Sequence, residues 1–159
     1  MNRRMLLLGL VALLPAMACA QGGPTAAQPE LPKEKLVVVT RDGVKHDFNV
    51  EMALTPQQQE TGLMFRPTVP ADGGMLFDWG SSREMAMWMH NTVAPLDMLF
   101  INTDGTIRRI AENTTPQSLA TIPSNGPVRG TLELAAGTAA RLHMRVGDKV
   151  RQRIFGNAS

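Results

Sequence analysis

The residues best suited to chemistry lie in one short stretch near the middle of the chain. His90, Asn91 and Thr92 end an apolar segment, and Asp97 opens the next one. Pro95 lies between the two segments and interrupts strand pairing, so we expect these polar side chains to lie close together. Such a group could hydrogen-bond a ligand, and Asp97 could orient His90 as a general base. The alternative is a polar turn whose side chains satisfy buried backbone groups, and Asn, Thr and Asp are ordinary turn residues.

Arg66 also has a choice of roles. Its guanidinium carries five donors in a fixed fork, which suits a clamp for a carboxylate or phosphate of a ligand. The same geometry suits an arginine that ties a loop to backbone carbonyls or to an acid such as Asp97. We favour this structural role, because a single arginine binds few anions well.

The methionines suggest a metal alternative. The chain contains 11 Met, and Met85, Met87 and Met89 alternate, so on a strand they would share one face. Thioethers favour Cu(I), and a copper site could be built from Met87 or Met89 with Met64 or Met75 folded nearby. The favoured alternative is that methionine fills gaps in a core supplied with only 2 Trp, 5 Phe and no Tyr.

Several reaction classes lack their characteristic residues in this sequence. A Gly-rich phosphate loop, a paired-cysteine cluster and a nucleophile elbow are all absent, and Cys19 is the single cysteine. No candidate nucleophile has an assigned base, so the sequence assigns no catalytic residue and no cofactor. An enzyme is therefore the weaker hypothesis, and a non-catalytic binding or accessory domain is the stronger one.

The first residues predict export. A basic stretch at residues 2–4 precedes an uncharged, mostly apolar run at residues 5–14, and the small residues Ala16, Ala18 and Ala20 follow. This order is typical of a signal peptide, which we place at residues 1–20. The apolar run has about ten residues, whereas a membrane-spanning helix needs roughly 20. The alternative is a membrane-anchored lipoprotein in which Cys19 becomes the acylated first residue.

The leader also accounts for the basic charge of the chain. The full sequence has 16 Lys and Arg against 14 Asp and Glu, and removal of Arg3 and Arg4 leaves 14 against 14. Nothing resembles a nucleic-acid-binding patch, so we expect no nucleic-acid partner. We expect a periplasmic or secreted protein whose partner is a small anionic ligand or another envelope protein. Membrane contact would come only through the leader or a lipid on Cys19.

Short apolar segments separated by turn signals predict a mainly β domain. Residues 36–40 are apolar or β-branched, Asp42-Gly43 favours a hairpin, and residues 48–54 alternate between apolar and polar. Further strands are expected at residues 75–77, 84–92, 98–101, 106–110, 132–134 and 149–155. This spacing predicts a jelly-roll-like β sandwich or barrel. One or two short helices are expected, one starting after Thr55 with a capping pattern and one within residues 138–144.

The domain boundaries follow from composition. Residues 21–34 are rich in Pro, Gly, Ala and Gln, which is typical of a flexible linker. We place the β domain at residues 35–155 and a short tail at residues 156–159.

Motifs in a fixed order carry a resemblance to a known family. They are Gly62-Leu63-Met64-Phe65-Arg66, Gly74-Met75-Leu76-Phe77, Met87-Trp88-Met89-His90-Asn91-Thr92, Pro95-Leu96-Asp97 and Leu132-Glu133-Leu134-Ala135-Ala136-Gly137. From about residue 36 to residue 150 the chain closely resembles the uncharacterised family called domain of unknown function 192. The resemblance implies a compact, mainly β, jelly-roll-like sandwich and no established reaction. Members usually have Lys where this chain has His90, so a role that needs a permanent cation there is in doubt.

We therefore predict an exported β domain that binds a ligand or partner. Its predicted contact surface is a polar end of the sandwich formed by Arg66, His90, Asn91, Thr92 and Asp97. A small envelope enzyme that uses His90 and Asp97 is the second hypothesis. A copper-binding protein that uses Met87 or Met89 is the third.

Overall fold

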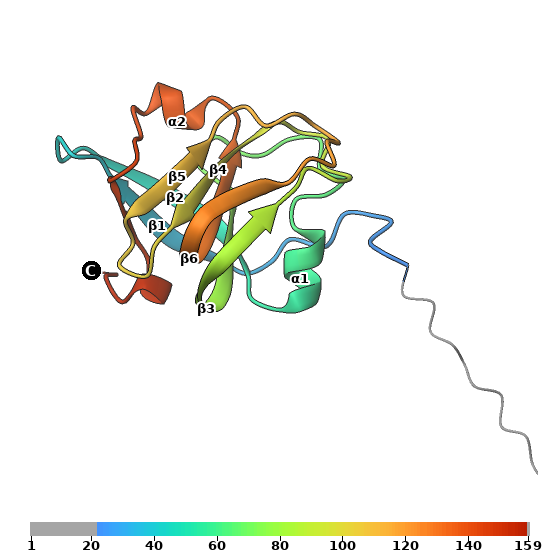
Figure 1. The fold of residues 1–159 in the computed structure, drawn as a ribbon. Helices are drawn as coiled ribbons and strands as arrows, with labels where there is room; N and C mark the ends of the chain where they lie inside the picture. Colours follow the sequence, from blue (N-terminus) through green and yellow to red (C-terminus); the bar gives the residue numbers. More distant parts are fainter. Residues whose placement is uncertain (1–21, 159) are drawn as a thin grey trace, which may run out of the picture.

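The computed structural model describes residues 22–158, which form one seven-stranded sheet with three short helices around it (Figure 1). The predicted signal peptide and Cys19 lie outside these residues. The elements in chain order are β1 (Lys33–Val39), β2 (Lys45–Ala53), α1 (Pro56–Thr61), β3 (Met75–Met87), β4 (Leu96–Ile101), β5 (Ile107–Ala111), β6 (Ile122–Ala135), α2 (Thr138–Arg141), β7 (Lys149–Arg151) and the 3-10 helix η1 (Arg153–Phe155). Within residues 22–158, no helix is both long enough and apolar enough to cross a bilayer.

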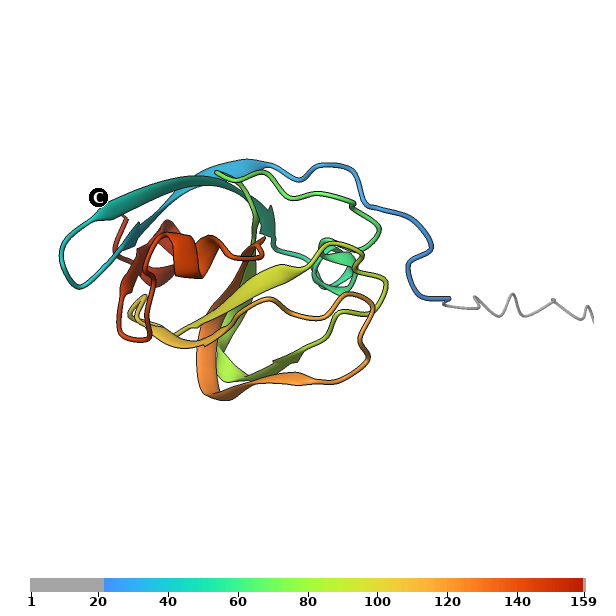
Figure 2. The ribbon, with the colours of Figure 1, turned by 90° about the horizontal axis from the view of Figure 1, so that it is seen from above.

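The sheet rolls up until its two edge strands meet. The strand order is β5-β4-β6-β3-β2-β1-β7, and Thr106, just before β5, bridges to Lys149 on β7. The N–H of Ile107 donates to the carbonyl of Asp148 at 2.9 Å. The N–H of Val150 donates to the carbonyl of Gly105 at 2.8 Å. Seen from above, the strands curve around a common interior (Figure 2). The prediction of a mainly β sandwich or barrel with one or two short α-helices is confirmed, as one nearly closed sheet.

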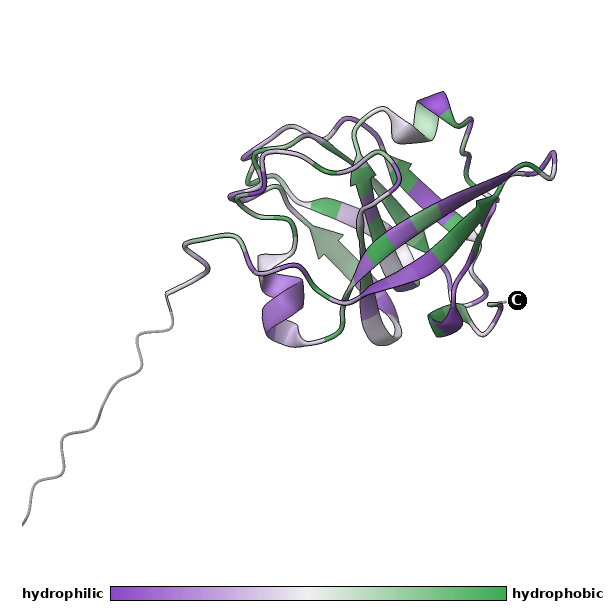
Figure 3. Cartoon of the chain, turned by 180° about the vertical axis from the view of Figure 1, so that it is seen from behind, coloured by the Kyte–Doolittle hydropathy of each residue, from purple (hydrophilic) through white to green (hydrophobic). Residues whose placement is uncertain are grey.

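Alternation along the strands builds the barrel interior. Leu36 and Val38 on β1, with Phe48 and Val50 on β2, are buried, whereas most of their neighbours in the chain are only half-buried or exposed. Figure 3 shows this alternation of apolar and polar residues along the β1–β2 hairpin. The same interior cluster also contains Met52, Leu76, Leu99, Ile101, Ile107, Leu132, Leu134, Ala139, Met144, Val150 and Phe155.

Strand β4, the first residues of β3 and the last residues of β6 are buried on both faces. Their second face carries another apolar cluster, which lies outside the barrel interior. The loops that precede β3 and β4 supply Leu63, Val69 and Met89 to this cluster, so these loops cover the sheet. The buried strand residues in it are Ala53, Met75, Phe77, Trp79, Leu96, Met98, Phe100 and Val128. A pocket can therefore form between this face of the sheet and the loops that cover it.

Helix α1 is positioned as its sequence predicts. The N–H of Gln58 donates to the Thr55 hydroxyl at 3.3 Å, and the Gln58 side chain accepts from the N–H of Thr55 at 3.0 Å, which completes a capping box. Gly62 ends the helix with a φ of 49°. A Cβ at this position would lie 3.1 Å from the ring of Phe77, so the end of α1 packs directly against β3.

Strand β6 is longer than predicted. The predicted strand covers residues 132–134, whereas β6 begins at Ile122 and also pairs with the outer part of β3. The pairing tolerates Pro123 and Pro127 because the register shifts twice, between Asp78 and Arg83 and between Glu84 and Ala86. Irregular ladders of this kind can place proline where no ladder hydrogen bond is needed.

The N-terminal segment docks on the barrel earlier than predicted. Strand β1 begins at Lys33, inside the segment 21–34 that we expected to be a flexible linker. The side-chain amide of Gln28 donates to the carbonyl of Gly62 at 2.9 Å, and the N–H of Leu31 donates to Glu51 at 2.8 Å. This part of the predicted linker is therefore docked on the barrel, because Gln28 and Leu31 bond to residues of the barrel.

Candidate functional site

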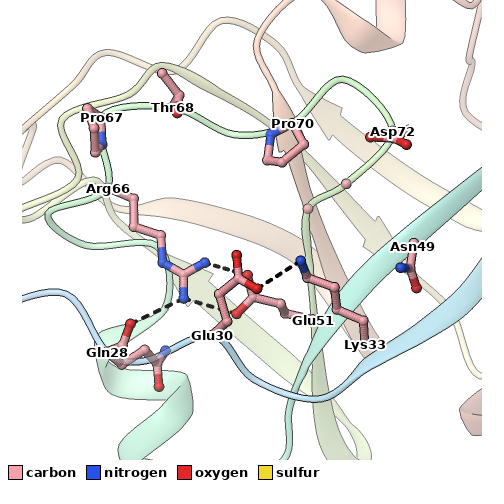
Figure 4. A pocket seen from close by; sticks show the side chains of 12 residues that line it. Gln28, Glu30, Lys33, Asn49, Glu51, Arg66, Pro67, Thr68, Pro70 and Asp72 are labelled. Atoms are coloured by element: carbon pink, nitrogen blue, oxygen red, sulfur yellow. Dashed lines mark hydrogen bonds and ion pairs between the residues drawn. The ribbon is translucent and has the colours of Figure 1, made fainter.

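Arg66 ties the N-terminal segment to the barrel. Its guanidinium forms an ion pair with Glu51, and Nη2 donates to Glu51 Oε2 at 3.0 Å. The same nitrogen lies 3.4 Å from each of the backbone carbonyl oxygens of Gln28 and Pro29. Figure 4 shows Arg66 pointing toward Glu51 and Gln28. Arg66 thus binds carbonyls and an acid, as the structural role requires, but the acid is Glu51 and not Asp97.

The pocket around this pair is polar, and Glu51 already neutralises the charge of Arg66. It has a volume of about 460 Å³ and is also lined by Glu30, Lys33 and Asp72. Burial alone would raise the pKa of Glu51, but hydrogen bonds from Arg66 and from the N–H of Leu31 hold that pKa below its ordinary value. An anionic ligand would have to displace the Glu51 carboxylate from Arg66, which makes this a poor anion site.

Asp97 faces the core and not a surface. It is fully buried, and its two oxygens accept from the N–H of Asn113 at 2.9 Å and from the N–H of Ala139 at 2.8 Å. These bonds tie the loop after β5 and the first turn of α2 to β4. The hypothesis of a His90–Asp97 pair is wrong, because both carboxylate oxygens of Asp97 accept hydrogen bonds from backbone amides. In the described part of the chain, Nδ1 of His90 is buried and has no hydrogen-bond partner.

His90, Asn91 and Thr92 form a turn. The imidazole lies against the indole of Trp88, with ring centroids 4.9 Å apart. Asn91 has a φ of 54°, and its carbonyl accepts from the N–H of Phe65 at 2.8 Å, which joins this turn to the loop after α1. Thr92 is buried, and its hydroxyl donates to the carbonyl of His90 at 3.3 Å. The five predicted surface residues are therefore divided: Arg66 at one pocket, Asp97 in the core and the other three in this turn.

The two candidate copper ligands, Met87 and Met89, lie in different surroundings. Met87 lines a second pocket together with Met64. Met89 is fully buried, its sulfur accepts a hydrogen bond from the Thr114 hydroxyl at 3.1 Å, and it does not line that pocket. Among residues 22–158 there is no cluster of three or more His, Cys, Asp or Glu side chains that could hold a metal ion. Met89 thus fills the core, as the favoured alternative requires.

This second pocket lies between α1, β3 and the turn at residues 88–92, over the second face of the sheet. Its volume is about 170 Å³. Its walls are mainly apolar and aromatic: Leu63, Met64, Phe77, Trp79, Ala86, Met87 and Trp88, with Gln59, Glu60, Thr61, Gly62, Thr92 and Glu133 completing the lining. Trp79 stacks on Phe77 at 5.4 Å between centroids and donates to the Thr131 hydroxyl at 3.1 Å, so its ring is held in place. Trp88 is 47% exposed, which places it at the mouth.

Glu133 is the unusual residue of this pocket. On β6 it pairs with Met75 of β3 on one side and Met98 of β4 on the other, and both methionines are fully buried. Glu133 itself is only 4% exposed. Its carboxyl group receives no hydrogen bond and no ion pair from any residue between 22 and 158. Burial raises the pKa of Glu133 to about 8, so at neutral pH it is mostly a carboxylic acid that can both donate and accept.

Glu133 is not among the site residues predicted from the sequence. It alternates with Leu132 and Leu134, which points it away from the barrel interior and therefore toward an expected solvent face. A signal was nevertheless present, because Glu133 belongs to a motif of the family resemblance. The pocket collects four of those motifs, through Gly62-Leu63-Met64, Phe77, Met87-Trp88 with Thr92, and Glu133.

Comparisons with known proteins agree with this resemblance. Residues 37–152 match the family DUF192, described as "Uncharacterized ACR". The chain belongs to the DUF192 family. None of the proteins with a curated function matches this sequence.

Two crystal structures of bacterial proteins resemble this DUF192 chain. One is a Sinorhizobium meliloti 1021 protein described as a candidate transcription regulator, with 48% identity, a TM-score of 0.77 and coverage of 80% of this chain and 99% of that one. The other is a protein of unknown function from Novosphingobium aromaticivorans DSM 12444, with 36% identity, a TM-score of 0.75 and coverage of 80% and 91%.

Proposed function

We propose that this DUF192 chain is an exported, non-catalytic binding domain of the cell envelope whose ligand enters the Glu133 pocket. Export is supported by the order of basic, apolar and small residues at the N-terminus. Nucleic acid is not among the proposed partners, because 14 basic and 14 acidic residues balance once the leader is removed.

The unpaired carboxyl of Glu133 carries the binding proposal. Glu133 is only 4% exposed, and no residue between 22 and 158 bonds its carboxyl, so the exposure that remains opens into the pocket that it lines. A ligand that enters the pocket would supply the missing partner. Apolar walls with one or two polar groups at the base are the usual composition of small-molecule sites.

The raised pKa of Glu133 favours a second candidate, an envelope enzyme. A carboxyl group that titrates near neutral pH is suited to general acid catalysis. The pocket offers Thr92 as its other buried polar side chain, but the hydroxyl of Thr92 donates to the carbonyl of His90 at 3.3 Å and has no assigned base. Binding is therefore the leading proposal.

Native mass spectrometry of the protein purified from its own envelope tests both candidates. We expect the wild-type protein to retain a small molecule that Glu133→Gln and Trp88→Ala variants lose. A Glu84→Gln variant, which changes an exposed carboxyl on β3, is the matched control and should retain it. A wild-type protein that carries no molecule, and whose pocket amide signals shift with no member of a fragment library, would refute the proposal. Conversion of the retained molecule by the purified protein would favour the enzyme.

A further inference from the structure

We infer that the ligand of the Glu133 pocket is a small organic cation, whose protonated nitrogen pairs with Glu133 while its apolar body lies against Trp79 and Trp88. This inference rests on the proposed function and names the chemical class of the ligand.

The charge of the lining carries the inference. The ionisable residues that line the pocket are Glu133 on β6 and Glu60 on α1, and both are acids. Lys, Arg and His are absent from the described lining. The strand residues beside Glu133, Met75 and Met98, are uncharged. A cation entering this pocket gains two acidic neighbours, whereas an anion meets no basic group.

The walls suit a cation equally well. The rings of Trp79 and Trp88 line the pocket together with Phe77, and an ammonium or amidinium group is attracted to aromatic faces, most strongly to tryptophan. Trp79 is held by its stacking on Phe77 and its hydrogen bond to Thr131, so a bound cation would not have to order it. Trp88 is packed against His90, the titratable residue of the neighbouring turn.

The size of the pocket limits the ligand. A volume of about 170 Å³ corresponds to roughly six water molecules at ~30 Å³ each. This space accommodates one charged nitrogen and a compact apolar body. A polymer or a folded protein segment could reach Glu133 only through a side chain of that size.

Binding of a cation would release a proton. In the empty pocket Glu133 carries a proton at neutral pH, because burial raises its pKa to about 8. A protonated amine stabilises the carboxylate, so one amine cation and one carboxylic acid give an ion pair and one free proton. At pH 7 a group with this pKa is about 90% protonated, so we expect release of about 0.9 proton per ligand bound. A neutral ligand would release none.

Isothermal titration calorimetry with three probes of one shape tests this class. Benzylammonium, benzyl alcohol and benzoate are titrated into the full mature protein at pH 7, in two buffers of different ionisation enthalpy. We expect benzylammonium to bind at least tenfold more tightly than benzyl alcohol and benzoate, with release of about 0.9 proton. Its affinity should rise about fivefold from pH 7 to pH 8, as the ionised fraction of Glu133 in the free protein increases from about a tenth to a half.

Variants separate this inference from the proposed function. Glu133→Gln should abolish both the preference for the cation and the proton release, whereas Glu84→Gln should leave both unchanged. If benzyl alcohol binds as tightly as benzylammonium and no proton is released, the ligand is not a cation. The proposed binding function would still stand. Failure of benzylammonium to bind at millimolar concentration would overturn the inference, and a neutral molecule retained in native mass spectrometry would still support the proposed function.

Discussion

Replacing Glu133 by Gln should remove a specific pH dependence of stability. Gln has nearly the same shape as Glu and cannot ionise. In the folded protein burial raises the pKa of Glu133 to about 8, whereas its ordinary value is 4.5. Between these values the folded state holds a proton that the unfolded state has lost. The free energy of unfolding therefore falls as the pH rises, and the contribution is fully present only below pH 4.5.

The size of the effect follows from this difference in pKa. One proton of difference gives a slope of about 1.4 kcal/mol per pH unit. Integrated from pH 5 to pH 8, with both titrations included, the wild-type protein should lose roughly 3–4 kcal/mol of unfolding free energy that the Glu133→Gln variant keeps. The carboxyls of Glu34, Glu51, Asp78 and Asp104 have lowered pKa values, so they reduce stability only at more acidic pH.

Urea denaturation at pH 5, 6, 7 and 8 measures this change in unfolding free energy directly. The three histidines of the chain are present in both proteins, so the difference between the two curves isolates Glu133. A Glu84→Gln variant should follow the wild-type curve. If the unfolding free energies of the wild-type protein and Glu133→Gln change in parallel with pH, Glu133 is not protonated in the folded protein. Burial would then not raise its pKa.

Three further substitutions test the structural assignments by the same denaturation assay. Gly74→Ala should cost about 3 kcal/mol or more, because its Cβ would lie 2.2 Å from the carbonyl oxygen of Glu133. At Gly80, where φ is 73° rather than the 152° of Gly74, a Cβ would meet no atom within 4 Å, so Gly80→Ala should cost only about 1–2 kcal/mol; equal costs would contradict the close approach at Gly74. Asp97→Asn should cost about 2 kcal/mol, because its NH₂ must face one of two backbone N–H donors, and an unaltered stability would argue against the observed bonds. Arg66→Met should cost about 3 kcal/mol at pH 7, because it strands the buried Glu51 carboxylate. That cost should shrink in a Glu51→Gln background. It should also shrink as the pH falls, because burial without Arg66 raises the pKa of Glu51 and the carboxyl of the variant then takes up a proton.

Local patterns in the sequence determined the elements whose geometry depends on near neighbours. Thr55 and Gln58 are three residues apart, and they cap α1 as predicted. Asp42-Gly43 forms the turn between β1 and β2, where the N–H of Gly43 donates to the carbonyl of Thr40 at 2.9 Å. The motifs in fixed order were enough to identify the family, because a resemblance in sequence requires no knowledge of contacts.

Only the tertiary structure decided which polar residues share a site. The partner of Arg66 is Glu51 rather than Asp97, and one partner of Asp97 is the backbone of Ala139, 42 residues further along the chain. Alternation alone pointed Glu133 out of the barrel and therefore toward solvent. Its burial comes from loops that fold back over the second face of the sheet, and no local pattern reports such a cover. The pKa of Glu133, and with it the candidate site, depends on that long-range packing, because the charged form of a carboxyl is penalised by everything that excludes water around it.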